Sequence, residues 1–320
     1  MNPQPSQRPE VSVLIITRNT RALTSGAIRS VRESRDTLVK EIIVVDNGST
    51  DDTAAALLRE FPQIQFICAE KNLGFSRACN LAAKRACGEF LLLLNSDARP
   101  EPDALAQAVA WMRTHPDCAV AGAQLLNADG SRQNSIANFP TLATELLNKS
   151  LLRRLRPEKF PGKEREYREP VEVETVVGAF MLVRKSVWDL FGGLDERYFF
   201  FFEETDFCLQ ARRRGQRVFH LPEVHVRHER GQTARQASVE ARIEYWRSRY
   251  TFFAKNHRPL ARLILAVGLW LRLLFDSLAA GLCALATLGQ NARWRERWRV
   301  CAALADWHLR GCPAEQGLPR

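Results

Sequence analysis

The sequence predicts an α/β fold, built on a doubly wound and mostly parallel sheet, with a C-terminal amphipathic helical extension. Two observations predict the sheet: apolar runs of strand length alternate with helical segments over residues 11–114, and the links between them are short. The charge distribution predicts a separate C-terminal part. Residues 1–210 hold 26 basic and 28 acidic side chains, whereas residues 211–320 hold 20 basic and only 8 acidic side chains. With 46% hydrophobic and 26% charged residues, the composition excludes a disordered chain, a collagen and a disulfide miniprotein.

Four apolar runs are predicted to be the strands: 11–17 (VSVLIIT), 41–46 (EIIVVD), 66–70 (FICAE) and 89–97 (EFLLLLNSD). Continuous apolar character is typical of parallel strands that are covered on both faces. Helices are predicted near 20–35, after residue 50, over 76–86 and over 101–114. Ligands of such sheets bind at the carboxyl ends of the strands, so the polar residues there are candidate site residues.

The chain between residues 151 and 215 changes character twice. Residues 151–170 are charged and contain Pro and Gly, which predicts an exposed loop. Apolar strand character resumes over 173–188, and residues 199–215 combine four phenylalanines, an acidic cluster and a helix that ends at Gly215. The eight cysteines form no CxxC pair and the polar N-terminus has no signal peptide, so we expect reduced thiols in a cytosolic protein.

Residues 258–289 form an unusual apolar segment. Before Arg272 its longest uncharged stretch is 263–271, which is too short to span a bilayer. At about 100° per residue, four charged side chains lie within roughly 80° of one another on a helix: Arg258, Arg262, Arg272 and Asp276. Downstream, arginines surround Trp294 and Trp298, as suits a lipid headgroup interface. Docking on a membrane surface is favoured over a helical pair packed on the protein body, and both over a transmembrane hairpin.

Carboxylates occupy two of the predicted strand ends. Asp97 follows the most apolar strand, where its oxygens suit a divalent cation; the alternative role is an N-cap for the next helix. Asp46 suits a contact with a base or a ribose; its alternative is an Asx turn.

An acidic cluster and three histidines lie in the second half of the chain. Burial beside the phenylalanines would raise the pKa of Glu203 or Glu204 and suit a general base. The alternative for these acids, and for Asp206, is to complement a helix dipole. Any of three histidines could complete a metal site with Asp97, or be an ordinary core or surface residue: His220, His225 and His228.

Taken in order, seven segments resemble the family 2 glycosyltransferases with the GT-A fold, especially bacterial rhamnosyltransferase-like members. They are VSVLIITRN, EIIVVDNGSTDDT, NLGFSRACN, LLLLNSD, GAFMLVRKSVW, GGLDERYFFFFEETDFCLQARRRG and the histidine segment ending VRH. The resemblance covers residues 11–256, so a GT-A domain is expected there, with a nucleotide-binding half (11–130) and an acceptor or catalytic half (171–256). Residues 1–10 are expected to be a disordered tail, and residues 257–320 a helical membrane-associating segment.

The resemblance also implies the chemistry, which is inverting transfer of a sugar from a nucleotide-diphosphate donor with Mg²⁺ or Mn²⁺. Asp97 matches the last acid of the family's DxD motif, whose first acid is Asn95 here, and His228 matches the histidine that completes the metal site. Glu204 is the implied base, and Asp206 is the second choice. The donor pocket is implied to contain Thr17, Asn19, Asp46, Asn72, Gly74, Arg77 and Asp97.

By the same resemblance the first expected donor is dTDP-rhamnose, and the expected acceptor is a hydroxyl of a lipid-linked or cell-surface glycan. The expected location is the cytoplasm, on the anionic inner face of the cell membrane, without a nucleic-acid partner. One alternative is a processive polysaccharide synthase, whose QxxRW motif occurs at Gln290–Trp294. Another is a non-catalytic membrane or nucleic-acid binding protein, which the presence of Asp97, Glu204 and His228 together disfavours.

Overall fold

The computed structural model describes residues 8–160, 165–229, 238–288 and 290–320. The chain divides into two compact units. The first comprises Met1–Phe139, Pro157–Phe199 and Glu203–Arg230, and the second comprises Pro140–Arg156, Phe200–Phe202 and Gly231–Arg320. Each unit is therefore assembled from segments that are distant in the sequence.

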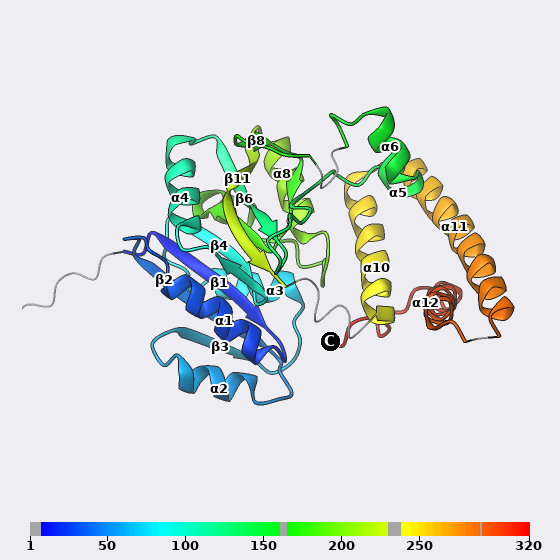
Figure 1. The fold of residues 1–320 in the computed structure, drawn as a ribbon, viewed down its shortest axis with the longest axis horizontal. Helices are drawn as coiled ribbons and strands as arrows, with labels where there is room; N and C mark the ends of the chain where they lie inside the picture. Colours follow the sequence, from blue (N-terminus) through cyan, green and yellow to red (C-terminus); the bar gives the residue numbers. More distant parts are fainter. Residues whose placement is uncertain (1–7, 161–164, 230–237, 289) are drawn as a thin grey trace, which may run out of the picture. The chain divides into compact units, whose positions relative to one another are not determined.

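The first unit is built on a mixed sheet with the strand order β3-β2-β1-β4-β10-β6-β11-β5 (Figure 1). Strands β1, β2, β3 and β4 are parallel neighbours, whereas β10 runs antiparallel to β4 and β6, and β5 runs antiparallel to β11. The strands are β1 (Val11–Thr17), β2 (Lys40–Asn47), β3 (Gln65–Ala69), β4 (Phe90–Asn95), β5 (Ala98–Pro100), β6 (Cys118–Leu126), β10 (Phe180–Arg184) and β11 (Arg217–His228). Strand β8 (Val171–Glu172) pairs with β11, and β7 (Ile136–Ala137) pairs with β9 (Thr175–Val176).

Helices cover both faces of this sheet, so the predicted doubly wound architecture is confirmed. Alternate strand residues face opposite layers: Ile15 packs with α1 (Arg21–Arg32), α2 (Thr53–Glu60) and α4 (Ala104–Thr114), whereas Leu14 packs with α3 (Phe75–Ala83), α7 (Lys185–Phe191) and α8 (Glu203–Arg213). The central strands β1, β4 and β6 are almost entirely buried because both of their faces are covered, whereas the edge strand β3 has exposed residues. The four predicted strands and the helices between them are all present, with ends that shift by a few residues.

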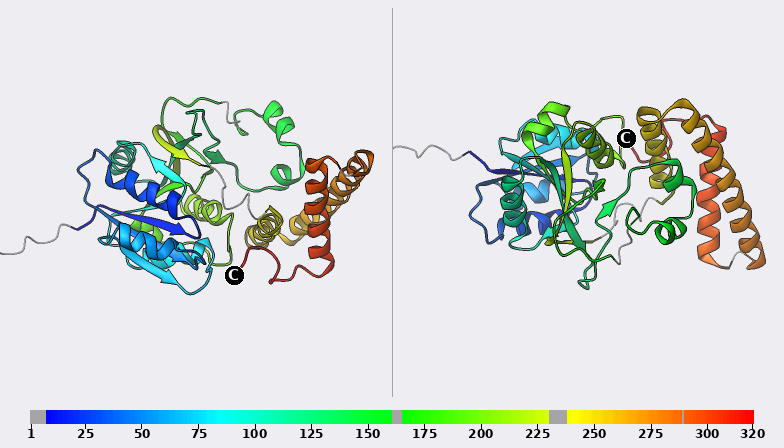
Figure 2. Two further views of the ribbon diagram at one scale, coloured as in Figure 1. Left: turned by 60° about the horizontal axis from the view of Figure 1, so that its bottom comes forward. Right: turned by 90° about the horizontal axis from the view of Figure 1, so that it is seen from above.

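The second unit is helical. It contains α5 (Leu142–Leu146), α6 (Lys149–Leu155), α10 (Ser238–Asn256), α11 (Pro259–Ala286) and α12 (Ala292–Leu309). The prediction of a loop over 151–170 is wrong at its start, because Asn148 caps α6 by accepting hydrogen bonds from the amides of Ser150 and Leu151. Both views of Figure 2 show α11 and α12 side by side.

Helix α11 presents an apolar face to solvent. Leu265, Leu269 and Leu273 are buried, and on a helix they lie on the same side as the four charged residues of this segment. The opposite side is exposed along its whole length; Phe275 is 71% exposed and Leu285 is 74% exposed. Of the described residues, this is the one helix that is long and apolar enough to cross a membrane by length and composition.

Candidate active site

The carboxyl ends of three strands meet at one edge of the sheet. In the parallel register Thr17 lies beside Asp46, and Ile16 lies beside Asn95. Asp97 follows in the turn between β4 and β5. The predicted convergence of the polar strand ends therefore holds in the structure for β1, β2 and β4.

Hydrogen bonds join the loops that follow these strands. The side-chain oxygen of Asn19 accepts from the amide of Thr50 at 2.8 Å, which ties the loop after β1 to the loop after β2. Asn47 donates to Asn72 Oδ1 at 2.9 Å and accepts from the amide of Leu73 at 2.7 Å. Hydrogen bonds of short amide side chains thus hold together the loops that follow β1, β2 and β3.

Two glycines allow these loops to approach closely. Gly48 has φ +73°, and a Cβ there would lie 2.6 Å from the Lys71 backbone. Gly74 has φ +81°, and a Cβ there would lie 2.6 Å from Phe199. Any other residue would be strained in this conformation and would push the loops apart.

The residues predicted to line the nucleotide-sugar pocket differ in how deeply their side chains are buried. Thr17 is buried, and its hydroxyl shares a hydrogen bond with Thr24 at 2.7 Å. Asp46 is also buried and accepts from both the amide and the hydroxyl of Ser49, a local contact three residues on rather than the two-residue Asx turn weighed as its alternative. Arg77 is exposed and its Nε lies 3.3 Å from Glu196 Oε2.

Asp97 and His228 face each other, as the metal prediction requires. Asp97 Oδ1 lies 3.3 Å from His228 Nε2, with 14% and 10% of the two side chains exposed. The N-cap of the following helix is Asp103, so Asp97 does not serve as that cap. In the described part of the chain, no group of three or more His, Cys, Asp or Glu is arranged to hold a metal ion. Asp97 and His228 are therefore a pair of potential ligands, and a cation between them would need further ligands from elsewhere.

Gln133 determines which nitrogen of His228 is available. Its side-chain nitrogen donates to the backbone oxygens of Leu126 and His228, so its side-chain oxygen is the atom that lies 3.1 Å from His228 Nδ1. A carbonyl oxygen only accepts, so Nδ1 carries a proton, and Nε2 is the ring nitrogen that faces Asp97. Such an outer partner commonly orients a metal-ligating histidine.

Replacing Gln133 by leucine is expected to weaken Mn²⁺ binding by about tenfold, because the imidazole loses the acceptor that fixes its tautomer. Electron paramagnetic resonance of Mn²⁺ with a nucleoside diphosphate measures the affinity, and ¹⁵N chemical shifts of His228 report the tautomer. Gln107→Leu, on the exposed side of α4, is the matched control. Unchanged affinity and tautomer in Gln133→Leu would contradict this role.

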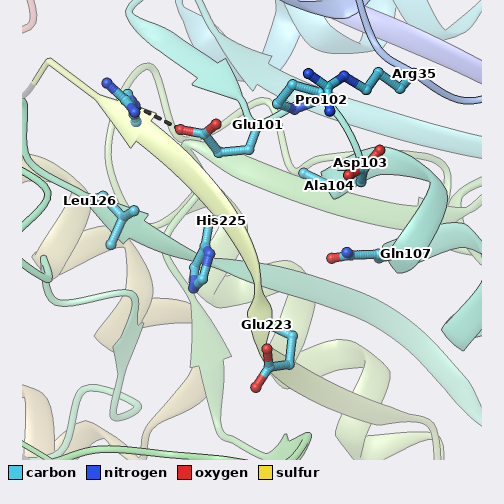
Figure 3. Close-up of a pocket in the computed structure, with 10 residues that line it drawn as sticks. Arg35, Glu101, Pro102, Asp103, Ala104, Gln107, Leu126, Glu223 and His225 are labelled. Atoms are coloured by element: carbon cyan, nitrogen blue, oxygen red, sulfur yellow. Dashed lines mark hydrogen bonds and ion pairs between the residues drawn. The ribbon is translucent and has the colours of Figure 1, made fainter.

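The structure separates the three histidines of β11. His220 is 1% exposed in the core, and burial lowers its pKa to about 4. His225 lines a hollow of about 480 Å³ that does not include Asp97 or His228. Figure 3 shows it among Glu101, Glu223 and Gln107, and the dashed line is the ion pair of Glu101 with Arg227. Only His228 of the three faces a carboxylate of the candidate site.

Acid is expected to destabilise the protein through His220. The unfolded chain binds a proton near pH 6.5 while the folded chain resists protonation until about pH 4, so stability falls as the pH is lowered across that window. Across this window the shifted pKa of His220 lowers the free energy of unfolding by at most about 3 kcal/mol. Urea unfolding at a series of pH values measures it. His220→Phe should flatten this dependence, whereas His225→Phe should not; equal slopes would refute the assignment.

Glu204 lies at the start of α8 and reaches the same edge of the sheet. It lies against Gly178, where a Cβ would be 3.6 Å from Glu204 Cγ, and the next residue, Ala179, accepts a hydrogen bond from the amide of Asn95 at 3.1 Å. Burial raises the pKa of Glu204, although the amides of Glu204 and Thr205 partly oppose the shift. Within the described ranges, Glu204 Oε2 has no hydrogen-bond partner. This is the arrangement of a carboxylate that is able to take a proton.

Asp206 and Glu203 lie deeper in the same helix. Asp206 is 2% exposed and accepts a hydrogen bond from the Tyr198 hydroxyl at 3.3 Å. Burial, followed by the charge of Asp206, raises the pKa of Tyr198, so its hydroxyl stays protonated and donates. Glu203 is 6% exposed. Of the three acids, Glu204 is the most accessible.

The family model for glycosyl transferase family 2 matches residues 12–191, more than half of the chain. The chain belongs to this glycosyltransferase family. Two relatives are each 24% identical to this glycosyltransferase over 68% of its length. They are N-acetylglucosaminyl-diphospho-decaprenol L-rhamnosyltransferase of Mycobacterium tuberculosis, covered over 75%, and dTDP-rhamnosyl transferase RfbF of Shigella flexneri, covered over 72%. The predicted family and its rhamnosyltransferase-like relatives are thus confirmed.

Solved structures confirm the GT-A-like fold. The mannosyltransferase PcManGT of Pyrobaculum calidifontis, in complex with GDP-Man and Mn²⁺, is 18% identical with a TM-score of 0.56, over 96% of this glycosyltransferase and 88% of that chain. TarS 1–349 of S. aureus with UDP-GlcNAc is 19% identical with a TM-score of 0.54, over 95% and 82%. At this level of identity, the likeness concerns the fold alone.

For three residues of this glycosyltransferase, only the structure shows the contacts or the burial that make them notable. Gln133 orients His228, and Asn47 holds the loop of Asn72. Arg18, directly after β1, has a buried Nε without a hydrogen-bond partner among the described residues. Its place at a strand end was visible in the sequence, but its burial was not.

Proposed function

We propose that the protein is an inverting, metal-dependent glycosyltransferase that moves a sugar from a nucleotide-diphosphate donor to a hydroxyl of a lipid-linked or cell-surface glycan. The observation that carries the proposal is the pair of Asp97 and His228 after β4, together with Glu204, which lies against Gly178, the residue before the Ala179 that accepts from Asn95. Burial raises the pKa of Glu204, and perturbed carboxylates near the carboxyl ends of strands are candidates for a functional site.

The donor is proposed to bind over the loops after β1, β2 and β3. Asn19 and Asp46 lie where a nucleoside would contact these loops, and Asn72, Gly74 and Arg77 flank them at the start of α3. Arg18 supplies a cation at the end of β1, and guanidinium groups suit the oxygens of a diphosphate. Relatives whose names include dTDP-rhamnosyl and L-rhamnosyltransferase make dTDP-rhamnose the first donor to test.

Asp97 and His228 would hold Mg²⁺ or Mn²⁺. Bound there, the cation would offset the negative charge that develops on the leaving nucleoside diphosphate. The protein's own part is to present one carboxylate oxygen and one imidazole nitrogen 3.3 Å apart, with Gln133 orienting the ring. The PcManGT structure, which contains Mn²⁺ with GDP-Man, supports this assignment by analogy of fold.

Glu204 is proposed to accept the proton of the acceptor hydroxyl as that oxygen attacks the anomeric carbon. A base works best when its pKa approaches the working pH, and burial shifts the pKa of Glu204 in that direction. Asp206 remains the second choice, although its hydrogen bond with Tyr198 ties it to the protein.

The proposed location is the inner face of the cell membrane, with peripheral attachment through residues 257–320. The exposed apolar side of α11 and the exposed Trp298 among arginines of α12 support it. Lipid association of such a surface combines burial of apolar side chains with attraction between basic residues and anionic lipids.

A thermal-shift screen of nucleotide sugars with Mn²⁺ tests the proposed function. We expect dTDP-rhamnose to raise the melting temperature more than nucleotide sugars with other bases, and the rise to require the cation, because bound donor stabilises the folded chain by mass action. Proton NMR of the transfer product then gives its anomeric configuration. A product that keeps the donor's configuration would contradict inversion, and a screen without any stabilising donor would contradict the whole assignment.

A further inference from the structure

A second hollow of about 760 Å³ lies within the helical unit, between α5–α6, α10 and α11. Four basic and two acidic side chains line it, which gives a net charge of +2: Lys149, Arg242, Arg249 and Arg272, with Glu145 and Asp276. The candidate active site uses none of these residues.

The deepest part of the hollow is built from buried charges. Arg249 is 9% exposed, and its Nε lies 2.9 Å from Glu145 Oε2, an ion pair without the alignment of a hydrogen bond. The Arg249 guanidinium also lies over the ring of Tyr245, 4.8 Å from its centroid. These contacts hold one guanidinium in place at the base of the hollow.

The two acids are already engaged by cations. Glu145 pairs with Arg249, and Asp276 pairs with Arg297 at 2.8 Å. The remaining positive charge comes from Lys149 and Arg242, which are exposed at the opening, and from Arg272, which is also exposed and whose Nε lies 3.8 Å from Asp276 Oδ2. The hollow therefore favours an anion, and guanidinium groups bind phosphate oxygens through paired hydrogen bonds.

The opening continues into the apolar face of α11. Phe275 lines the hollow and is also 71% exposed, and Leu147 on the other side is 50% exposed. At about 100° per residue, the exposed apolar residues of α11 lie within roughly 120° of one another: Leu260, Leu263, Ile264, Val267, Leu271, Leu274, Phe275, Leu278, Leu282 and Leu285. We call this set the apolar stripe; the 28-residue helix that carries it is about 42 Å long.

We propose that this hollow binds the phosphate or diphosphate head of a membrane lipid whose chain lies along the apolar stripe. The anionic head of such a lipid matches the cationic hollow, and its long apolar chain matches the adjoining stripe. The inference rests on the proposed function in one respect: a lipid-linked acceptor has this chemistry. Beyond the proposed function, the inference assigns the head of that acceptor to a binding site in the helical unit.

Vesicle binding of the full chain tests the proposal without a donor. We compare phosphatidylcholine vesicles with the same vesicles containing a few per cent of a polyprenyl diphosphate. The wild type should bind the doped vesicles at least tenfold more tightly. Reversing the three charges at the opening (Lys149→Glu, Arg242→Glu, Arg272→Glu) should abolish that gain. The matched control reverses three exposed arginines of the same unit that do not line the hollow (Arg153→Glu, Arg154→Glu, Arg156→Glu) and should keep it.

The outcomes separate the components of the proposal. Equal losses in the two triple variants would overturn it, since net charge would then explain binding. Leu274→Gln with Leu278→Gln, both at exposed positions, should weaken binding to both kinds of vesicle; unchanged binding would overturn the role of the stripe. Inorganic pyrophosphate should compete with doped vesicles; if it binds the hollow while doped and undoped vesicles bind alike, the ligand is a free phosphate and the lipid proposal fails.

Failure of the proposed function is recognised separately. The thermal shift produced by a nucleotide sugar depends on the sheet unit, so it should be the same in the wild type and in both triple variants. A lost shift in all proteins contradicts the glycosyltransferase site, whereas a preserved shift without lipid discrimination contradicts only the hollow.

Discussion

Replacing Glu204 by glutamine is expected to lower the rate of sugar transfer by about 10²–10⁴-fold, the usual contribution of a general base. Glutamine keeps the size and shape of the side chain but does not take a proton at neutral pH. Donor binding should change by less than about twofold, because Glu204 is proposed to act on the acceptor hydroxyl. Single-turnover transfer together with donor titration measures both quantities.

The pH dependence provides an independent test of the same residue. Burial raises the pKa of Glu204, and a general base works only when it is deprotonated. We therefore expect kcat/KM of the wild type to rise with pH through a pKa above that of an ordinary glutamate, and this limb to vanish in any residual activity of Glu204→Gln.

Two further variants serve as controls for the base. Glu223→Gln, at an exposed position on the hollow of Figure 3, should transfer sugar at the wild-type rate. Asp206→Asn should affect stability more than chemistry, because Asp206 is buried and bonded to Tyr198. Loss of turnover in Asp206→Asn alone would assign the general base to Asp206. Wild-type turnover in both variants would show that neither acid is the base.

Replacing Asp97 by asparagine is the second change with a large expected effect. Asparagine keeps the shape of the side chain but removes the negative charge that would attract a divalent cation. We expect Mn²⁺ affinity in the presence of a nucleoside diphosphate, and with it the transfer rate, to fall by about 100-fold, as for loss of electrostatic stabilisation in other sites. Chelation of the wild type with EDTA should stop transfer, and added Mn²⁺ should restore it.

The control for Asp97 is Asp103→Asn, an exposed acid at the N-cap of α4. It should leave both Mn²⁺ affinity and stability nearly unchanged, because Asp103 makes no side-chain capping hydrogen bond and asparagine is tolerated equally well at an N-cap. Transfer that survives EDTA would contradict the metal. Loss of activity in Asp97→Asn with normal Mn²⁺ affinity would instead assign Asp97 a direct role toward the sugar.

The sequence alone predicted the sheet and its polar edge. Runs such as 11–17 and 89–97 are apolar without alternation, which a strand tolerates only when both of its faces are covered. From the alternation of strands and helices with short links it followed that the ends near Thr17, Asp46 and Asp97 would lie at one edge, and the register places the ends of these three strands there. The roles assigned to these residues stay predictions, as do the domain limits.

The sequence did not predict the partners of these side chains, because tertiary contacts join residues that are distant along the chain. Gln133 and His228 are 95 residues apart, and no local pattern indicates that an amide fixes the tautomer of that histidine. Likewise, three histidines within nine residues of one strand are equivalent in the sequence, and only the structure shows that His220 lies in the core whereas His228 faces Asp97.

Helix α11 shows the same division most clearly. Its sequence determined that charged residues share one side and apolar residues the other, since this follows from the helical repeat alone. Only the tertiary structure decided which side is packed: Leu265, Leu269 and Leu273 lie on the side of the charged residues and are buried there while the arginines of that side stay exposed, so the apolar stripe faces outward. Periodicity fixes the relative directions of side chains on a helix, but the rotation of that helix depends on what its neighbours offer for burial.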